Sequence, residues 1–368
     1  MTKREKEIIE ILKKEPMISQ NDLANRLGIS RSSVAVHITN LMKKEIIAGK
    51  GYVIREDNYV AVLGGANVDI MGFPKEAFKP GDSLPGTVLQ SLGGVGRNIA
   101  ENLSKLEVPV RFLTLVGDDP NGDFIRQETK ASGVDVSHIH TDKKHGTGIY
   151  FSVQDEDGEM IAAISQMDIY DEMDLGYLEK VLPVLRSAAR IIVDTNLSEE
   201  ALRFVANNLS DKELIVDTVS SKKALRIKDF VGKFSTIKPN RVESEILTGI
   251  PIVDDESLKA NAHWFFEQGV KRVFISLGSQ GTFAATPKIM GKVTSRKVHM
   301  KNANGAGDAF IAAMVMTSLQ TKDIREWAKN GSAAAISAIL SEDTINRDLS
   351  LEKINEIKKE YQIEWKNM

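Results

Sequence analysis

The segment NANGAGDAF, residues 302–310, places small residues and one carboxylate directly before an apolar run. Gly305, Ala306 and Gly307 would let the backbone approach a ligand without side-chain collision, and the free N–H groups of a helix start attract anions. Asp308 falls in the first turn of the expected helix, where it could accept a proton from a hydroxyl group. Aspartate is also common there merely as a residue that starts helices, so the segment alone leaves both roles open.

Four other motifs combine glycines with polar residues. Each has a plain structural alternative, namely a strand end, a tight turn, a helix cap or a loop. In chain order they are GGANVD with Asn67 and Asp69, GGVGRN with Gly94 and Asn98, KPNRVE with Asn240 and Glu243, and SLGSQG with Ser276, Gly278 and Gly281. No G-x-x-x-x-G-K-[ST] loop and no dinucleotide fingerprint occurs, which argues against a P-loop enzyme and against a dehydrogenase.

The elements that must position these motifs follow from the hydrophobic pattern. From Tyr59 onward, apolar strands such as VRFLTLVG, RIIVDTN and ELIVDTV alternate with helical stretches, which predicts a parallel sheet covered on both faces. Residues 146–167 predict a hairpin around Asp155–Gly158. With the segment after Asp69, this hairpin could form a small β-lid over the carboxyl ends of the main strands, where open α/β sheets bind ligands. We therefore expect a three-layer α/β/α sandwich with a small β-lid.

The N-terminal residues 1–57 are expected to form a separate domain, ahead of a larger one over residues 58–368. An amphipathic helix over 3–14 precedes two short helices that flank Gly28, which allows a tight turn. Residues 46–54, IIAGKGYVI, are expected to form a β-wing. This arrangement resembles the winged helix-turn-helix domains of bacterial transcription regulators.

The third helix of that domain indicates how it would meet DNA. Val34, Ile38 and Leu41 share one face and predict its buried side. The other side, with the wing, supplies the predicted DNA-binding residues Arg31, Ser32, Val36, Thr39, Lys43 and Lys50. Residues 1–50 hold 10 Lys and Arg against 6 Asp and Glu, a charge of +4, while the rest carries −7. That asymmetry favours DNA contact through this domain, although a module for dimerisation alone is the alternative.

The five glycine motifs, in this order and at these spacings, resemble the ribokinase (PfkB) family of carbohydrate and nucleoside kinases. The resemblance covers residues 59 to about 350, and it implies ATP and Mg²⁺ as cofactors. Asp308 would be the catalytic base, and the N–H groups of Gly305, Ala306 and Gly307 would hold the transferring phosphoryl group. The other implied roles are sugar binding by Asn67, Asp69, Gly94, Asn98 and Asn196, magnesium organisation through water by Asn240 and Glu243, and ATP binding by Ser276, Gly278, Gly281 and Asn330.

The chemistry agrees with that assignment. Phosphoryl transfer requires mainly positioning and charge neutralisation. A carboxylate with an ordinary pKa near ~4 is ionised at pH 7 and could take the proton as the hydroxyl attacks. One position departs from the family, because Asn302 stands where many members have an acidic residue that helps to bind potassium. Activation by a monovalent cation is therefore in doubt.

Several segments, including GGVGRNIAENL, VDTNLS and TINRDLS, resemble the pseudouridine kinase branch, some members of which also carry a winged helix. The branch implies 5′-phosphorylation of pseudouridine, with Ser165, Gln166 and Met167 of the lid facing the pseudouracil ring. Met167 could instead be merely packed. Ser165 and Gln166 replace the asparagine and aspartate usual there, so inosine, ribose, fructose or another nucleoside or sugar stays open. A transcription regulator that uses the kinase fold as a ligand sensor is a further alternative.

The location and assembly of the protein follow from simpler observations. The chain has no cysteine, no apolar run long enough to span a bilayer and no secretory apolar region, so we expect a cytoplasmic protein without a membrane partner. A homodimer is expected, because the lid hairpin has edges to cover.

Overall fold

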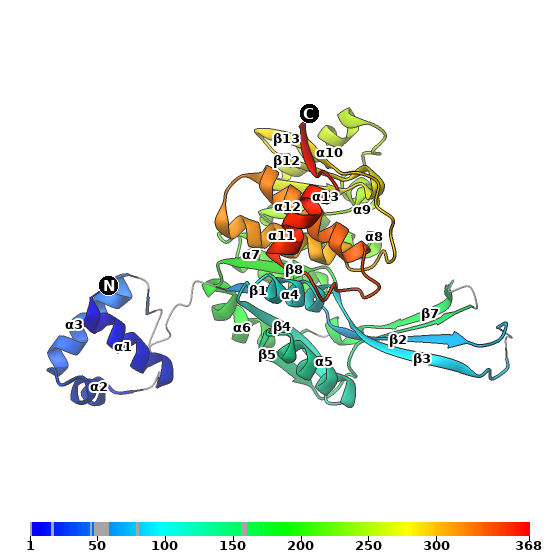
Figure 1. The fold of residues 1–368 in the computed structure, drawn as a ribbon. Helices are drawn as coiled ribbons and strands as arrows, with labels where there is room; N and C mark the ends of the chain where they lie inside the picture. The colour runs from blue at the N-terminus through cyan, green and yellow to red at the C-terminus, as the bar shows by residue number, and fades with distance from the viewer. Residues whose placement is uncertain are drawn as a thin grey trace. The chain divides into compact units, whose positions relative to one another are not determined.

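The computed structural model describes residues 2–15, 18–44, 46–47, 59–78, 81–155, 160–171 and 173–368. The chain divides into two compact units, Met1–Asn58 and Tyr59–Met368, which are drawn in Figure 1. Each unit has a hydrophobic core of its own. Among the described residues, no helix has the length and apolar character that crossing a membrane requires.

The described residues of the first unit form three helices, α1 (Lys3–Lys14), α2 (Gln20–Leu27) and α3 (Arg31–Lys43). Ser19 and Ser30 accept hydrogen bonds from backbone N–H groups at the starts of α2 and α3, and Gly28 ends α2 with φ of 62°. The turn at Gly28 is a confirmed prediction. Most of the predicted wing, including Lys50, lies outside the described residues.

The face of α3 that was predicted to point inward is buried. Val34, Ile38 and Leu41 pack with α1 and α2 around Ile8 and Leu12. The remaining predicted DNA-binding residues on α3 are all exposed: Arg31, Ser32, Val36, Thr39 and Lys43. The helix therefore presents the surface that DNA contact would need.

The second unit is built on one ten-stranded sheet, ordered β14-β13-β12-β11-β10-β9-β8-β1-β4-β5. Seven strands form its parallel part: β1 (Val60–Leu63), β4 (Val110–Gly117), β5 (Asp135–Asp142), β8 (Arg190–Asp194), β9 (Leu214–Asp217), β10 (Thr236–Lys238) and β11 (Arg272–Ser276). The three strands at one edge are antiparallel: β12 (Thr282–Thr286), β13 (Ile289–Thr294) and β14 (Glu364–Asn367). The parallel part was predicted, whereas the antiparallel edge was not.

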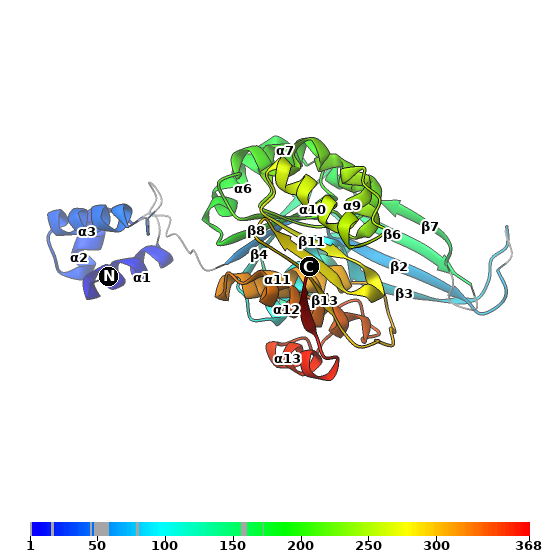
Figure 2. The ribbon, with the colours of Figure 1, turned by 90° about the horizontal axis from the view of Figure 1, so that it is seen from above.

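Helices cover both faces of this sheet, as Figure 2 shows. One layer contains α6 (Leu175–Ser187), α7 (Glu199–Asn208), α9 (Arg241–Thr248) and α10 (Asp255–Gln268). The other contains α4 (Val95–Lys105), α5 (Pro120–Ala131), α11 (Ala306–Gln320), α12 (Ile324–Ile339) and α13 (Leu351–Glu360). The predicted three-layer sandwich is confirmed.

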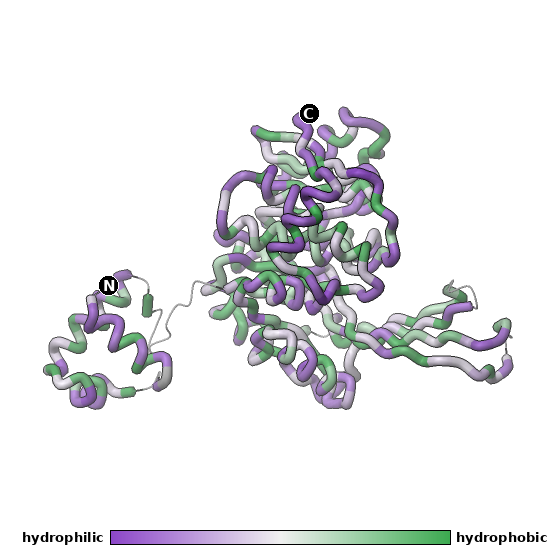
Figure 3. Tube along the Cα trace, viewed as in Figure 1, coloured by the Kyte–Doolittle hydropathy of each residue, from purple (hydrophilic) through white to green (hydrophobic). Residues whose placement is uncertain are grey.

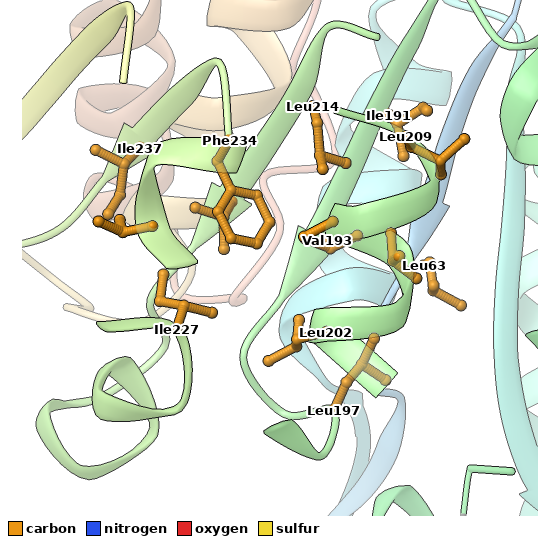
Figure 4. Close-up of a cluster of buried hydrophobic side chains, with 14 of the residues drawn as sticks. Leu63, Ile191, Val193, Leu197, Leu202, Leu209, Leu214, Ile227, Phe234 and Ile237 are labelled. Carbon is orange, nitrogen blue, oxygen red and sulfur yellow. The ribbon is translucent and has the colours of Figure 1, made fainter. Parts of the chain in front are cut away.

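The core lies between the sheet and each helix layer. Figure 3 shows the hydropathy of the chain, and Figure 4 shows Leu63, Ile191 and Val193 of the sheet packed near Leu202 of α7. The helical segment that follows β9 is short. It ends as α8 (Ser221–Ala224) and continues as a 3₁₀ segment, Leu225–Lys233.

A second sheet of four strands projects from the body in Figure 1 and forms the predicted lid. Its order is β3-β2-β6-β7, from β2 (Asn67–Pro74), β3 (Gly86–Gly93), β6 (Ile149–Gln154) and β7 (Met160–Gln166). The predicted hairpin is the antiparallel pair β6 and β7, although residues 156–159 of its turn are not described. The outer strands β3 and β7 are largely exposed.

Candidate active site

Three neighbouring parallel strands end in charged residues. Asp194, Asp217 and Lys238 are the last residues of β8, β9 and β10, and their register places them side by side along the carboxyl edge of the sheet. All three side chains are buried. Buried charged side chains are rare unless they bind a ligand or pair with each other, and open α/β sheets bind ligands at this edge. The carboxyl edge of the sheet is therefore the candidate location of the active site.

Asp308 faces this edge from the first turn of α11. Its side chain is 8% exposed, and Asn98 of α4 donates a hydrogen bond from Nδ2 to its Oδ2 over 2.9 Å. Two predicted site residues that lie 210 positions apart in the chain are thus in direct contact. Arg97, which was not predicted, donates from Nη1 to Oδ1 of Asn98 over 3.3 Å and pairs with Glu101. This contact turns the amide so that its Nδ2 faces the carboxylate.

The acidity of Asp308 differs from the expectation. Burial, followed by the carboxylate of Asp217, raises the pKa of Asp308 to about 7, against the opposing effects of Asn98 and Lys238. Burial likewise raises the pKa of Asp217 to about 6. The prediction of an ordinary pKa near ~4 was therefore wrong. The main cause of the raised pKa is burial, and the strand-end carboxylates of Asp217 and Asp194 add to it.

Glycines allow α4 to approach the end of β1 closely. Gly94 has φ of 98°, and a Cβ there would lie 2.5 Å from Cα of Ala66 and from the carbonyl oxygen of Gly65. A Cβ on Gly64 would lie 2.3 Å from Oδ2 of Asp194. A larger residue at position 94 would separate α4 from the end of β1, and one at position 64 would collide with Asp194 of β8. This packing carries Asn98 to Asp308, while the predicted contact of Gly94 with a sugar stays a prediction.

The start of α11 is open to an anion. Gly305 precedes it with φ of 76°, and a Cβ there would lie 2.0 Å from the carbonyl oxygen of Thr344. No side chain caps the helix. The first N–H groups, which include those of Ala306 and Gly307, therefore have no acceptor within the helix. They lie next to Asp308, and their contact with a phosphoryl group stays a prediction.

The predicted sugar-binding residues surround the same end of the sheet. Asn67 is buried and donates through its amide to Asp69, whose pKa is raised by burial. Asn196 accepts a hydrogen bond from Nζ of Lys223 over 2.6 Å. A pocket of about 530 Å³ opens here, and its lining includes Ser165, Met167, Asn196, Lys223 and Arg226. Gln166, on the exposed strand β7, is not part of that lining.

A second pocket, of about 430 Å³, lies beyond the ends of β10 and β11. Its lining includes three predicted residues, Asn240, Ser276 and Gly278, together with Arg241 and Gln280. Two other predicted ATP-binding residues do not line it. Gly281, with φ of 91°, forms the turn into β12, where a Cβ would lie 2.0 Å from the carbonyl oxygen of Val293.

Asn330 is the other predicted residue outside this pocket. Its amide donates to Oγ1 of Thr317 over 3.0 Å and accepts from Nζ of Lys358 over 2.9 Å. These bonds tie α12 to α11 and α13 and give Asn330 a structural role. Its contact with adenine stays a prediction.

Asn240 and Glu243 form a capping box at the start of α9. Oε2 of Glu243 accepts from the backbone N–H of Asn240 over 2.9 Å and from Oγ1 of Thr218 over 2.6 Å. Among the described residues, no group of three His, Cys, Asp or Glu could hold a metal ion directly. Mg²⁺ usually keeps several waters and binds to phosphates, so this pair suits an outer-shell contact through water.

Asn302 closes the loop before α11. It donates from Nδ2 to the carbonyl oxygen of Glu342 over 3.1 Å and accepts from the N–H of Asn304 over 2.9 Å. The side chain thus holds the loop in place and brings no charge for a monovalent cation.

Comparisons with known proteins agree with this geometry. Residues 57–350 match the pfkB family carbohydrate kinases, and residues 1–48 match the winged helix-turn-helix DNA-binding family. The uncharacterized sugar kinase YeiI of Escherichia coli is 35% identical over 95% of this chain and 98% of its own length. The pseudouridine kinase of Escherichia coli is 33% identical over 82% of this chain and 96% of its own length.

A solved structure gives the same result. The crystal structure of a presumed sugar kinase from Clostridium perfringens superposes with a TM-score of 0.78 at 32% identity, and the match covers 85% of this chain and 99% of the other. The family match extends over most of the sequence and includes every motif at the carboxyl edge of the sheet. The chain therefore belongs to the pfkB family of carbohydrate kinases.

Proposed function

We propose that the chain transfers the γ-phosphate of ATP to the 5′-hydroxyl of a nucleoside, with pseudouridine as the first candidate. The observation that carries the proposal is the Asp308 carboxylate, held by Asn98 beside the uncapped start of α11. A hydroxyl group between them would lose its proton to Asp308 as its oxygen attacks the γ-phosphorus. The bond from that phosphorus to the bridging oxygen breaks, and ADP leaves.

The remaining residues would bind and orient the reactants. Asn67, Asp69 and Asn98 would hold the ribosyl hydroxyls, while the pocket bordered by Met167 and Asn196 would receive the base. Ser276, Gly278 and Asn240 would line the ATP side. Magnesium, when bound to the phosphates, supplies charge neutralisation, and Asn240 with Glu243 would fix its waters.

The choice of pseudouridine is supported by the relative of that name and by the pocket beside the lid. A panel of acceptors tests it. With ATP and Mg²⁺, we expect pseudouridine to show the highest kcat/KM among pseudouridine, uridine, inosine, ribose and fructose. A higher kcat/KM for inosine or for a free sugar would contradict pseudouridine as the substrate, while the proposed kinase activity would still stand. If no nucleoside or sugar were phosphorylated, the result would favour the alternative that the kinase fold serves as the ligand sensor of a transcription regulator.

We further propose that the N-terminal unit binds DNA through α3. The family match and the exposed residues Arg31, Ser32 and Thr39 support this role. With the full chain and a duplex from the upstream region of its own gene, we expect affinity to fall steeply as salt is raised.

The matched variants are Arg31→Ala and Arg4→Ala. Arg31 is exposed on α3, while Arg4 lies on α1 and pairs with Glu7. Both remove one positive charge, but only Arg31→Ala should weaken binding, by roughly tenfold for one lost phosphate or base contact. Equal effects of the two changes, or no binding at low salt, would favour a dimerisation module.

A homodimer stays a prediction. The strands β3 and β7 lie at the edges of the lid sheet, and both are exposed, which is the property on which the expectation rests. Light scattering on the full chain measures the mass directly, and a monomer at micromolar concentration would contradict the prediction.

A further inference from the structure

Lys238, at the end of β10, carries a buried ammonium group without a polar partner. Its side chain is 6% exposed. It makes neither a hydrogen bond nor an ion pair with any part of the chain that the structure describes, and its Nζ lies 5.8 Å from the ring centre of Phe310. An ammonium group loses strong hydration on burial, so an isolated one is costly to the fold. The position therefore calls for an anion that the protein itself does not supply.

The neighbouring acids do not fill that role. Asp217 stands beside Lys238 in the strand register, and Asp308 faces both, yet neither carboxylate forms an ion pair with the lysine. Lys238 acts on them only at longer range, by favouring their ionised forms. A lysine retained purely as a counter-ion would be expected to contact a carboxylate.

The direction of the side chain identifies where the anion would sit. A Cβ added to Gly307 would lie 3.1 Å from Nζ of Lys238, so the ammonium group is close to the first turn of α11. That turn is uncapped and presents free N–H groups. The ammonium group and the N–H groups thus converge on one volume, and Asp308 borders it. The glycine at 307 keeps this volume open.

We propose that Nζ of Lys238 binds the terminal phosphoryl group of a nucleoside triphosphate, together with the N–H groups of the α11 start, while that group is transferred. The assignment rests on the proposed function. A lysine is a compact charge that suits a phosphoryl oxygen, and preorganised positive charge lowers the barrier most where negative charge must shift between two oxygens. Lys238 would then contact the reacting group, which ADP lacks.

Binding of two nucleotides by the Lys238→Met variant tests the assignment. By calorimetry, the affinity for a non-hydrolysable ATP analogue should fall about 10- to 100-fold, whereas affinity for ADP should change less than about twofold. Turnover of the best acceptor should fall about 10²- to 10³-fold with little change in the KM of that acceptor. Lys238→Arg, which keeps the charge, should retain the discrimination between the two nucleotides.

Two further variants separate the alternatives. Lys292→Met removes a half-buried lysine that pairs with Asp255 on the sheet edge, and it should affect neither measurement. In the double variant Asp217→Asn/Lys238→Met, a pure counter-ion role predicts recovery of turnover, which would overturn the proposal. Equal loss of ADP and analogue binding, or loss of neither, would overturn it too.

The nucleotide comparison also keeps the two proposals apart. It needs no acceptor, so a chain that phosphorylates none of the panel compounds would count against the proposed function while Lys238 is still tested. If Lys238→Met does not fold, as judged by circular dichroism, the Arg variant carries the test. An Arg variant that binds the analogue no better than ADP, while the unaltered chain prefers the analogue, would overturn the assignment.

Discussion

Replacing Asp308 with asparagine should reduce kcat at pH 8 by about 10²- to 10⁴-fold, which is the range for the loss of a positioned general base. Asparagine has nearly the same shape and can still accept the hydrogen bond from Asn98. Substrate binding should therefore change little. Initial rates with saturating ATP and nucleoside measure the loss, and calorimetry with the nucleoside alone measures the binding.

Stability serves as the control for this variant. Because the pKa of Asp308 is raised to about 7 in the fold, the folded state holds this proton more tightly than the unfolded state. The group therefore lowers stability progressively as pH rises from its unfolded value to about 7. Removing its charge should leave the unfolding midpoint at pH 8 unchanged or higher. Asp323→Asn, at the start of α12, is the matched change outside the site. If Asp308→Asn turned over its substrate as fast as the unaltered chain, Asp308 could not be the general base.

Activity should fall steeply in mild acid. With a pKa of about 7 for Asp308, about half of the base is ionised at pH 7 and about one-hundredth at pH 5, so kcat/KM for the nucleoside should drop about 50-fold between these two pH values. The charged groups that set this value are Asp217, Lys238 and Asp194, and Asn98 contributes a hydrogen bond.

The variant Asp217→Asn tests the electrostatic origin of that profile. It removes a negative charge next to Asp308, so the pKa of Asp308 should fall and the acid limb should move to lower pH. Asp174→Asn, at the start of α6, should leave the limb in place. If Asp217→Asn did not move the acid limb of the pH profile, the titrating group would be one other than Asp308, such as the bound nucleotide.

Much of the fold could be predicted because its signals are local. VRFLTLVG is one continuous apolar run and became a buried strand with the predicted limits, Val110–Gly117. The lid hairpin followed from alternation on both sides of a turn. The antiparallel edge was missed because TFAAT and IMGKVT are short and follow a glycine loop. EWKN pairs with a strand about seventy positions earlier, and no local pattern reports such a pairing.

The site was predictable only in part. The family resemblance implied that Asn98 and Asp308 both face the acceptor, but it did not predict their contact, since nothing local links residues 210 positions apart. Asp194, Asp217 and Lys238 each ended an apolar run and were passed over as ordinary strand ends. The sequence did contain a signal for this part of the site, because three successive strands each end in a charged residue. Only the strand register, which places these three residues side by side, shows that they belong to one site.

The packing of Gly305 against Thr344 has a practical consequence for protein engineering. The same short stretch receives a hydrogen bond from Asn302 at Glu342, and the backbone N–H of Lys301 bonds to Ile339 over 2.8 Å. Residues 339–344 thus hold the loop from which α11 starts. Deleting residues after α12, or inserting a peptide tag there, would remove these contacts even though the altered residues lie outside both pockets. Shortened versions made for crystallisation should therefore keep this stretch intact.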